Sequence, residues 1–172
     1  MKQIRKGLSA CAVALLLAAC GGGGGGGGGD GTRTAELTFS VDSAGTLSAP
    51  VQGVVVSAVL PAGATVATDP GTTSISAAAL AAGKDLTSPD KMVSGTFSAV
   101  DRKVQVAVAT PEETFLGGNV ATVTVTCPPA TTAADFTLGP SESFQAAGYD
   151  PVRQTIVDLA TRITPSLTVT FR

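Results

Sequence analysis

The residues with the most specific chemistry in this sequence are three cysteines and one pair of adjacent glutamates. The 172-residue chain contains Cys11, Cys20 and Cys127, and it contains no histidine. Without histidine, Ser-His-Asp and Cys-His catalysis, histidine-containing metal sites and the usual pH switch are excluded. Three cysteines are also too few for a cysteine-rich zinc site. What remains open is modification or pairing of a thiol, and acid-base chemistry by carboxylates.

Cys20 closes a segment with the character of a secretion signal. Lys2, Arg5 and Lys6 precede an uncharged, mostly apolar run from Leu8 to Ala19. This run is too short to cross a bilayer as a stable helix. A basic start followed by a short apolar run predicts a secretory signal peptide over residues 1–19, rather than a transmembrane helix.

The apolar run ends in Leu17, Ala18, Ala19 and Cys20. These four residues resemble the lipobox of bacterial lipoprotein precursors, in which a leucine and two small residues precede an obligatory cysteine. The resemblance implies cleavage before Cys20 and attachment of a diacylglycerol to its thiol, so that the membrane is a partner of the chain. Stable anchoring needs more than one acyl chain, since each buried methylene contributes about 0.8 kcal/mol. The alternative is an ordinary cleaved signal with a cysteine near the cleavage site.

Nine consecutive glycines, Gly21 to Gly29, follow Cys20. Glycine loses more backbone entropy on ordering than any other residue, so residues 20–34 are predicted to be a lipidated flexible tether. Nine such residues span roughly 17 Å as a random coil. In lipoproteins of well-studied diderm bacteria, an aspartate after the cysteine retains the protein at the inner membrane. Gly21 therefore implies, by resemblance, the outer membrane, on its periplasmic or its surface-exposed face.

The charge balance argues against a nucleic-acid partner. The chain has 11 Lys and Arg against 13 Asp and Glu, for a formal net charge of −2. Cleavage after residue 19 would remove three basic residues and no acidic one. The remaining chain would have eight basic and thirteen acidic residues, for a formal net charge of −5. Such a chain has no electrostatic attraction for phosphate backbones.

Aromatic residues make up only 4% of the chain, which is few for a surface that stacks sugars or bases.

From Thr32 onward, short runs rich in Val and Thr alternate with clusters of Gly, Pro, Asp and Ser. This pattern predicts an all-β antiparallel sandwich over residues 35–172. Val54 to Leu60 is apolar on both faces and predicts a central strand. Four other runs alternate apolar and polar residues, which predicts strands that each bury one face. The residues predicted on these buried faces are Leu37, Phe39 and Val41 in the first run; Val104, Val106 and Val108 in the second; Val123, Val125 and Cys127 in the third; and Leu167, Val169 and Phe171 in the fourth.

Two segments leave the choice between helix and strand open. Ser76 to Ala82 is rich in alanine and predicts one helical turn ended by Gly83. Val152 to Ile163 has apolar residues at helical spacing, yet its threonines and Pro165 are also compatible with a pair of strands. We favour strands for this second segment.

Three segments resemble strands of cohesin-like modules in the carbohydrate-binding-module sandwich superfamily: Val51 to Leu60, Gly118 to Val125 and Phe136 to Leu138. The resemblance covers about Ala35 to Phe171. It implies a nine-stranded jelly roll that binds a protein through one sheet face, with Ala147 to Asp150 as an Asp-containing turn. True cohesins bind calcium-loaded dockerins. Because the chain has neither a dockerin-like repeat nor a second cohesin, a lone lipid-anchored receptor fits better than a cellulosome scaffold.

The other reactive side chains are expected to be structural. Cys127 alternates with Val123 and Val125 and predicts a buried thiol, the alternative being an intermolecular disulfide. Glu112 and Glu113 predict a solvated loop pair, because adjacent residues point apart, unlike glycosidase carboxylates that face each other across a cleft.

Metal and sugar sites also lack their usual patterns. A calcium site usually requires a loop in which aspartates alternate with other residues, and the sequence has no such loop. Its aspartates are scattered instead, at Asp42, Asp69, Asp85, Asp90 and Asp101 among other positions. Most of the aromatic residues Phe115, Phe136, Phe144 and Tyr149 are expected in the core, with Tyr149 exposed if it lies in a turn.

The sequence therefore predicts a non-enzymatic, lipid-anchored binding module of the bacterial cell envelope. It would recognise a protein or a polysaccharide through a sandwich face, without a cofactor, a metal or catalytic residues. The alternative is a structural subunit whose exposed strands add to a neighbouring sheet. An enzyme is disfavoured, because it would have to work with carboxylates, Lys or Ser alone.

Overall fold

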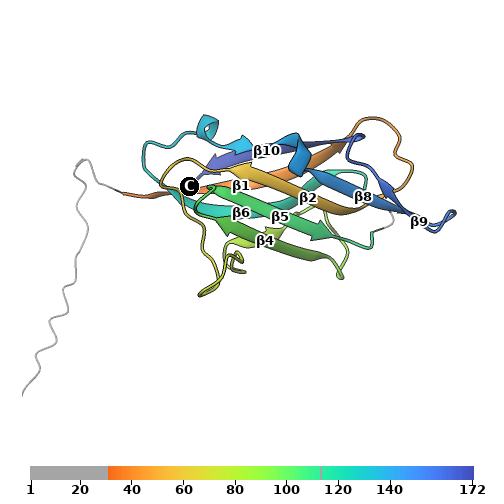
Figure 1. The fold of residues 1–172 in the computed structure, drawn as a ribbon, viewed down its shortest axis with the longest axis horizontal. Helices are drawn as coiled ribbons and strands as arrows, with labels where there is room; N and C mark the ends of the chain where they lie inside the picture. Colours follow the sequence, from red (N-terminus) through yellow and green to blue (C-terminus); the bar gives the residue numbers. More distant parts are fainter. Residues whose placement is uncertain (1–30, 113) are drawn as a thin grey trace, which may run out of the picture.

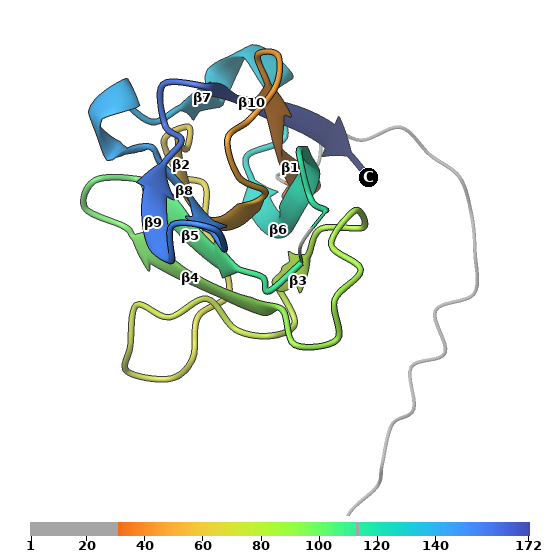
Figure 2. The ribbon, with the colours of Figure 1, turned by 90° about the vertical axis from the view of Figure 1, so that its right-hand side faces the viewer.

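The computed structural model describes residues 31–112 and 114–172, which form two antiparallel sheets packed face to face (Figures 1 and 2). The predicted all-β sandwich is confirmed. Two short 3-10 helices, η1 (Ala133–Asp135) and η2 (Ser141–Ser143), interrupt the strands. Within the described ranges, no helix has the length and apolar character needed to cross a membrane.

One sheet has four strands in the order β10-β1-β6-β3. Their bounds are β1 (Arg33–Ser43), β3 (Leu80–Ala82), β6 (Gly118–Cys127) and β10 (Ile163–Phe171). Leu37 of β1 lies opposite both Val123 of β6 and Val169 of β10, so the apolar positions of three strands share one face. β1 begins at Arg33, two residues before the boundary expected at residue 35.

The second sheet has the order β4-β5-β2-β8-β9, and β7 pairs with the far end of β2. As predicted, β2 is a central strand with neighbours on both sides. The described residues contain ten strands in all, one more than the cohesin-like resemblance implies. The bounds in this sheet are β2 (Val51–Val59), β4 (Met92–Ser98), β5 (Lys103–Ala109), β7 (Thr137–Leu138), β8 (Gln145–Asp150) and β9 (Thr155–Asp158).

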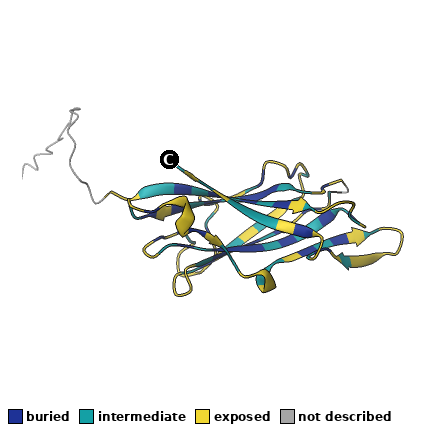
Figure 3. Cartoon of the chain, turned by 90° about the horizontal axis from the view of Figure 1, so that it is seen from above, coloured by how far each residue is buried: buried dark blue, intermediate teal, exposed yellow. Residues whose placement is uncertain are grey.

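The hydrophobic core lies between the two sheets, where the alternating strands bury one face each (Figure 3). The predicted inward residues of β1, β5 and β6 are all buried. Those of β10 are only half-buried, because β10 is an edge strand of its sheet. Period-two alternation was therefore a correct guide to which side chains form the core.

The helical turn predicted from Ser76 to Ala82 is wrong over its second half. The carbonyl of Ser76 accepts hydrogen bonds from the N–H groups of Ala79 and Leu80, at 2.9 and 3.1 Å, which closes a single turn. From Leu80 onward the chain is strand β3, paired with β6. Pairing with a neighbouring strand therefore outweighs the helix propensity of the alanines.

The segment from Val152 to Ile163 forms strands rather than a helix, as favoured from the sequence. β9 pairs with β8, and β10 begins at Ile163. The apolar residues at helical spacing do not share a face: Leu159 and Ile163 are buried, whereas Val152 and Ile156 are exposed. The helical spacing in this segment was therefore coincidental.

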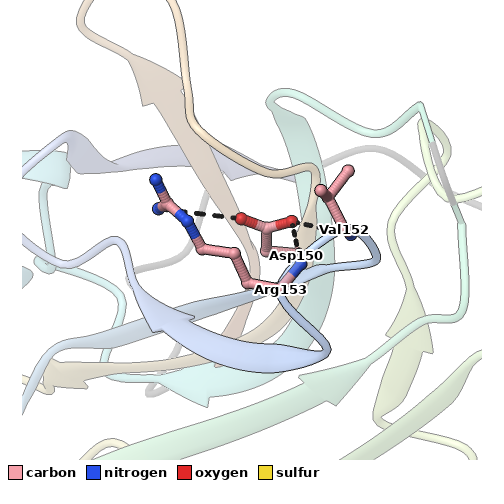
Figure 4. A network of polar contacts seen from close by, with 3 residues as sticks. All are labelled: Asp150, Val152 and Arg153. Atoms are coloured by element: carbon pink, nitrogen blue, oxygen red, sulfur yellow. Dashed lines mark hydrogen bonds and ion pairs between the residues drawn. The ribbon is translucent and has the colours of Figure 1, made fainter.

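The turn expected at Ala147 to Asp150 is displaced by several residues. These residues belong to β8, and only Asp150, the last of them, takes part in the turn. Its Oδ1 accepts hydrogen bonds from the backbone N–H groups of Val152 and Arg153, at 2.9 and 3.1 Å (Figure 4). Its Oδ2 lies 3.8 Å from the Arg153 guanidinium. The carboxylate thus organises the loop between β8 and β9.

Candidate functional site

The predicted lipid-attachment residue, Cys20, lies outside the described residues. The same holds for the lipobox residues Leu17, Ala18 and Ala19, and for the glycines of the predicted tether. Signal cleavage, lipidation and the tether therefore stay predictions from the sequence.

Cys127 is buried in the core, as expected, with 1% of its surface exposed. Its thiol donates to the carbonyl oxygen of Arg33 at a sulfur–oxygen distance of 3.4 Å. Among the described residues it is the free cysteine. Its position on the inner face of β6 makes it a packing residue of the sandwich.

The acidic residues accept hydrogen bonds from loops. Glu112 is half-buried rather than fully solvated, because its carboxylate accepts the backbone N–H of Ser88. Its predicted partner Glu113 lies outside the described residues. Asp85 Oδ2 accepts the N–H of Asn119 at 2.8 Å. In residues 31–112 and 114–172, no group of three or more Asp, Glu, Cys or His side chains is placed to hold a metal ion.

The aromatic residues divide between the core and the surface. Phe115 and Phe136 are buried, and Phe144 is half-buried. Tyr149 is exposed, but it lies on strand β8 rather than in a turn. This exposed ring is on the outer face of the six-stranded sheet.

The outer face of that sheet carries a hollow of about 760 Å³. We call it the outer-face hollow and define it by a low floor, formed by Gly53, Ala109 and Ala147, and by higher rims that include Met92, Ile156 and Asp158. Its volume falls in the range of about 300–1,000 Å³ that is typical of ligand sites.

The register of the strands explains the low floor. One cross-strand row contains Met92, Ala109, Gly53, Ala147 and Asp158, from β4, β5, β2, β8 and β9 in turn. The three central residues have no side chain larger than a methyl group. The floor is therefore backbone covered by hydrogen atoms and methyl groups, between longer side chains on the outer strands.

The hollow changes character along the strands. In the next row Ser94, Ala107, Val55 and Gln145 lie side by side. Beyond them, a smaller hollow of about 160 Å³ includes Gln105 in its lining. An occupant lying along β5 would meet apolar groups near Ala109 and polar groups near Gln105.

Large apolar side chains are exposed around the hollow. Six are exposed in the described residues, and three of them lie on this face: Met92 (72% exposed), Ile156 (80%) and Tyr149 (39%). Tyr149 and Ile156 are a cross-strand pair of the β8–β9 hairpin, and exposed Val152 lies in its loop. Apolar exposure gathered around a concave surface is typical of an interaction site.

Gly53, at the centre of the floor, has room for a side chain. Its φ is not positive, and a Cβ added there would meet its nearest neighbours at 4.0 Å, an ordinary contact. By contrast, a Cβ on Gly148 of β8 would lie 2.4 Å from the Pro50 carbonyl oxygen. A glycine within a strand weakens it and often marks a β-bulge, a tight bend or the close approach of a ligand or another chain. The pairing of β2 with β8 shifts register between Val51 and Gly53, so a β-bulge accounts for a glycine here, and its missing side chain keeps the floor of the hollow low.

Asp158 is the one ionisable side chain in the lining of the hollow. Its Oδ1 accepts the N–H of Ala160 at 2.9 Å. No basic side chain is in the lining: Lys91, next to Met92 in the chain, donates from Nζ to the Ser88 carbonyl at 3.1 Å, and Arg162 donates to the Thr46 carbonyl at 3.5 Å. The hollow thus combines apolar surface with a single negative charge, which suits binding of an apolar partner that carries a cation.

The residues of the hollow were missed by the sequence-based reasoning. The signal was nevertheless present, because Gly53, Ala107, Ala109 and Ala147 fall at outward positions of strands, where polar residues are usual. In a single sequence, small residues at such positions are also compatible with the ordinary alternation of a strand. Their gathering on one surface becomes visible only when the order of the strands is known.

No protein-family model, curated protein or solved structure matches this chain. The resemblances to lipoprotein precursors and to cohesin-like modules therefore stay predictions. They rest on the lipobox residues and on the strand pattern.

Proposed function

We propose that this chain is a lipid-anchored, non-enzymatic binding module of the bacterial cell envelope, and that it holds a protein partner in the outer-face hollow. The observation that carries the proposal is the gathering of exposed apolar side chains around a concave surface with a low floor. The lipobox at Cys20 and the glycines after it support the anchor. The residue after the cysteine, Gly21, favours the outer membrane.

A protein partner is favoured over a polysaccharide by the chemistry of the lining. Sugar sites stack aromatic rings on the sugar and hydrogen-bond its hydroxyl groups. The lining holds one aromatic residue, Phe144, which is half-buried. Most of the remaining residues are alanine, valine, methionine or isoleucine. Such a surface gains free energy mainly by burying apolar groups of its partner.

Pro165 disfavours strand addition at the β10 edge of the four-stranded sheet. The N–H of Arg172 bonds to the Thr34 carbonyl, and the N–H of Ala44 bonds to the Arg162 carbonyl. Even-numbered residues of β10 therefore bond toward β1, and odd-numbered ones face the free edge. Pro165 lies at this edge without an N–H, which discourages addition of another strand.

The proposal is tested by capture of the partner with full-length protein that carries a C-terminal tag and is solubilised in mild detergent. We expect Gly53→Leu, which fills the hollow, to reduce the recovered partner about tenfold or more. The Tm of the variant should be unchanged or raised, because Gly53 has room for a side chain and glycine weakens a strand.

Thr168→Leu is the matched control, since it adds an apolar side chain to an exposed position of β10 in the other sheet. It should leave the recovered partner unchanged. Equal recovery with the wild type and with Gly53→Leu would rule out the hollow as the binding surface.

A further inference from the structure

We propose that the occupant of the outer-face hollow is an amphipathic α-helix of the partner protein, which places a Lys or Arg side chain at Asp158. This inference rests on the proposed function and specifies the chemistry of the partner. The helix would lie over β5 and β2 with its apolar side on the floor formed by Ala109, Gly53 and Ala147.

The floor strands exclude an extended peptide. β5 pairs with β4 and β2, β2 pairs with β5 and β8, and β8 pairs with β2 and β9. Their backbone N–H and C=O groups are directed within the sheet and are already used there. An extended segment on this face would have no partners for its own backbone, and unpaired backbone groups are costly to bury. A helix forms its backbone hydrogen bonds internally.

The width of the hollow suits a helix. Met92 on β4 and Ile156 on β9 stand on strands four places apart, and strands are about 4.8 Å apart, so the rims are separated by roughly 19 Å. A helix with its side chains is about 10–12 Å across. The absence of a side chain at Gly53 lets the helix approach the sheet closely between the rims.

A second copy of the chain does not fit as the occupant. Two concave faces placed together would meet at their rims and leave a void between their floors. Each copy would also bring its Asp158, and no lining residue carries a positive charge to balance the pair. Loss of packing and like-charge repulsion both disfavour that arrangement.

Asp158 determines the charge of the partner. One carboxylate oxygen is engaged with the Ala160 N–H, and within the described residues the other accepts no hydrogen bond. No Lys or Arg side chain is in the lining of the hollow. The complementary cation must therefore come from the partner. A Lys or Arg on the flank of the helix would supply it.

The test places a photo-cross-linking amino acid, benzoylphenylalanine, at Met92 or at Ile156 of the full-length chain in cells. Thr168, exposed on the other sheet, is the control position. Cross-linked peptides are identified by mass spectrometry. We expect both rim positions to capture one protein segment with apolar residues at spacings of three and four and with Lys or Arg beside them, and Thr168 to capture none of it.

The outcomes separate this inference from the proposed function. Capture of a segment with alternating apolar residues, or of a second copy of this chain, would overturn the helix but retain a protein bound at the hollow. Capture of a lipid or polysaccharide would overturn both. Absence of capture at the rims, with a partner still recovered by the tagged protein, would overturn the hollow itself.

The charge is tested with the captured segment made as a synthetic peptide. Asp158→Asn keeps an oxygen for the Ala160 N–H and removes the charge. We expect it to weaken peptide binding about three- to tenfold at low salt, with a smaller effect as salt rises. A peptide with its Lys or Arg changed to Gln should bind wild type and Asp158→Asn equally. Unchanged affinity of Asp158→Asn for the original peptide would refute the pairing.

Discussion

At the scale of single residues, the carboxylates of this domain shape its loops. Asp150, Asp158, Asp85 and Glu112 each accept a backbone N–H from a loop or a strand end. Asp135 does the same for Thr132, whose hydroxyl also donates to it. Turns expose N–H groups that no strand satisfies, and an acidic side chain nearby satisfies them at little cost. These acidic side chains therefore stabilise the loops in which they lie, and at Asp158 a single carboxylate oxygen does so.

Asp135 gives a prediction about pH. Hydrogen bonds from the Thr132 backbone N–H and hydroxyl lower the pKa of Asp135 below its usual 3.8. Because the pKa is lower in the folded state, the charged group stabilises the fold above the unfolded pKa, and this contribution is lost as pH falls through the folded pKa. We expect Asp135→Asn to be slightly less stable than wild type at neutral pH, with the difference disappearing in acid.

Urea unfolding of both proteins across this pH range measures the difference. A gap in stability that persists at the lowest pH would show that the charge of Asp135 is not its cause. Asp101→Asn is the control variant. Asp101 is another acidic residue in a loop, and its hydrogen bonds link it to Ser98 rather than to Thr132.

At the scale of elements, the β8–β9 hairpin holds one rim of the outer-face hollow. Tyr149 and Ile156 face each other across it, and Asp150 organises its loop. β9 pairs only with β8, so its position depends on the hairpin itself. The loop carboxylate is therefore linked to the shape of the outer-face hollow, although Asp150 is not in its lining.

Asp150→Ala should destabilise this hairpin. The change removes the acceptor for two backbone N–H groups, and we expect a loss of about 1–2 kcal/mol in the free energy of unfolding. Hydrogen exchange of residues 145–158 should increase more than that of β1. Arg153→Ala removes only an exposed ion pair and should cost less than about 0.5 kcal/mol. Equal effects of the two variants would assign the stabilisation to the ion pair.

The fold could be predicted from the sequence because alternation is a local signal. Leu37, Phe39 and Val41 report a buried face without any knowledge of their neighbours. Strand order is not local, however, and the hollow depends on it. Ala109 and Ala147 are far apart in the chain, and they join Gly53 only through the pairing of β5, β2 and β8. A single sequence does not reveal that pairing.

The helix and turn predictions were wrong in part for a related reason. Alanines near Ser76 favour a helix in isolation, but the chain there completes an edge of the four-stranded sheet. Asp150 was correctly associated with a turn, yet the residues before it are held in β8 by pairing with β2 and β9. In both cases long-range pairing outweighs local preference.

At the scale of the whole molecule, the predicted anchor would determine where the sandwich works. We expect Cys20→Ala to move the protein out of the membrane fraction and to abolish the acyl mass on the N-terminus, because the thiol that would carry the lipid is lost. Gly21→Asp should keep the acyl mass and move the protein from the outer to the inner membrane. Fractionation with mass spectrometry of the N-terminal peptide measures both.

A wild-type N-terminus that carries no acyl group, with membrane association unchanged in Cys20→Ala, would contradict the anchor. The outer-face hollow should bind its partner equally in the two variants once they are solubilised, because its lining is formed by residues between Gly53 and Ala160.

The direction of β1 has a consequence for access to the hollow. β1 starts at Arg33 at one end of the sandwich and runs for 11 residues, about 35 Å, before the chain turns into β2 and reaches Gly53 (Figure 1). The apolar end of the hollow is therefore at the pole remote from the predicted attachment to the membrane. A partner in the surrounding compartment could reach this end without passing the predicted tether, whereas a partner held at the tether would be separated from it by about the length of a strand.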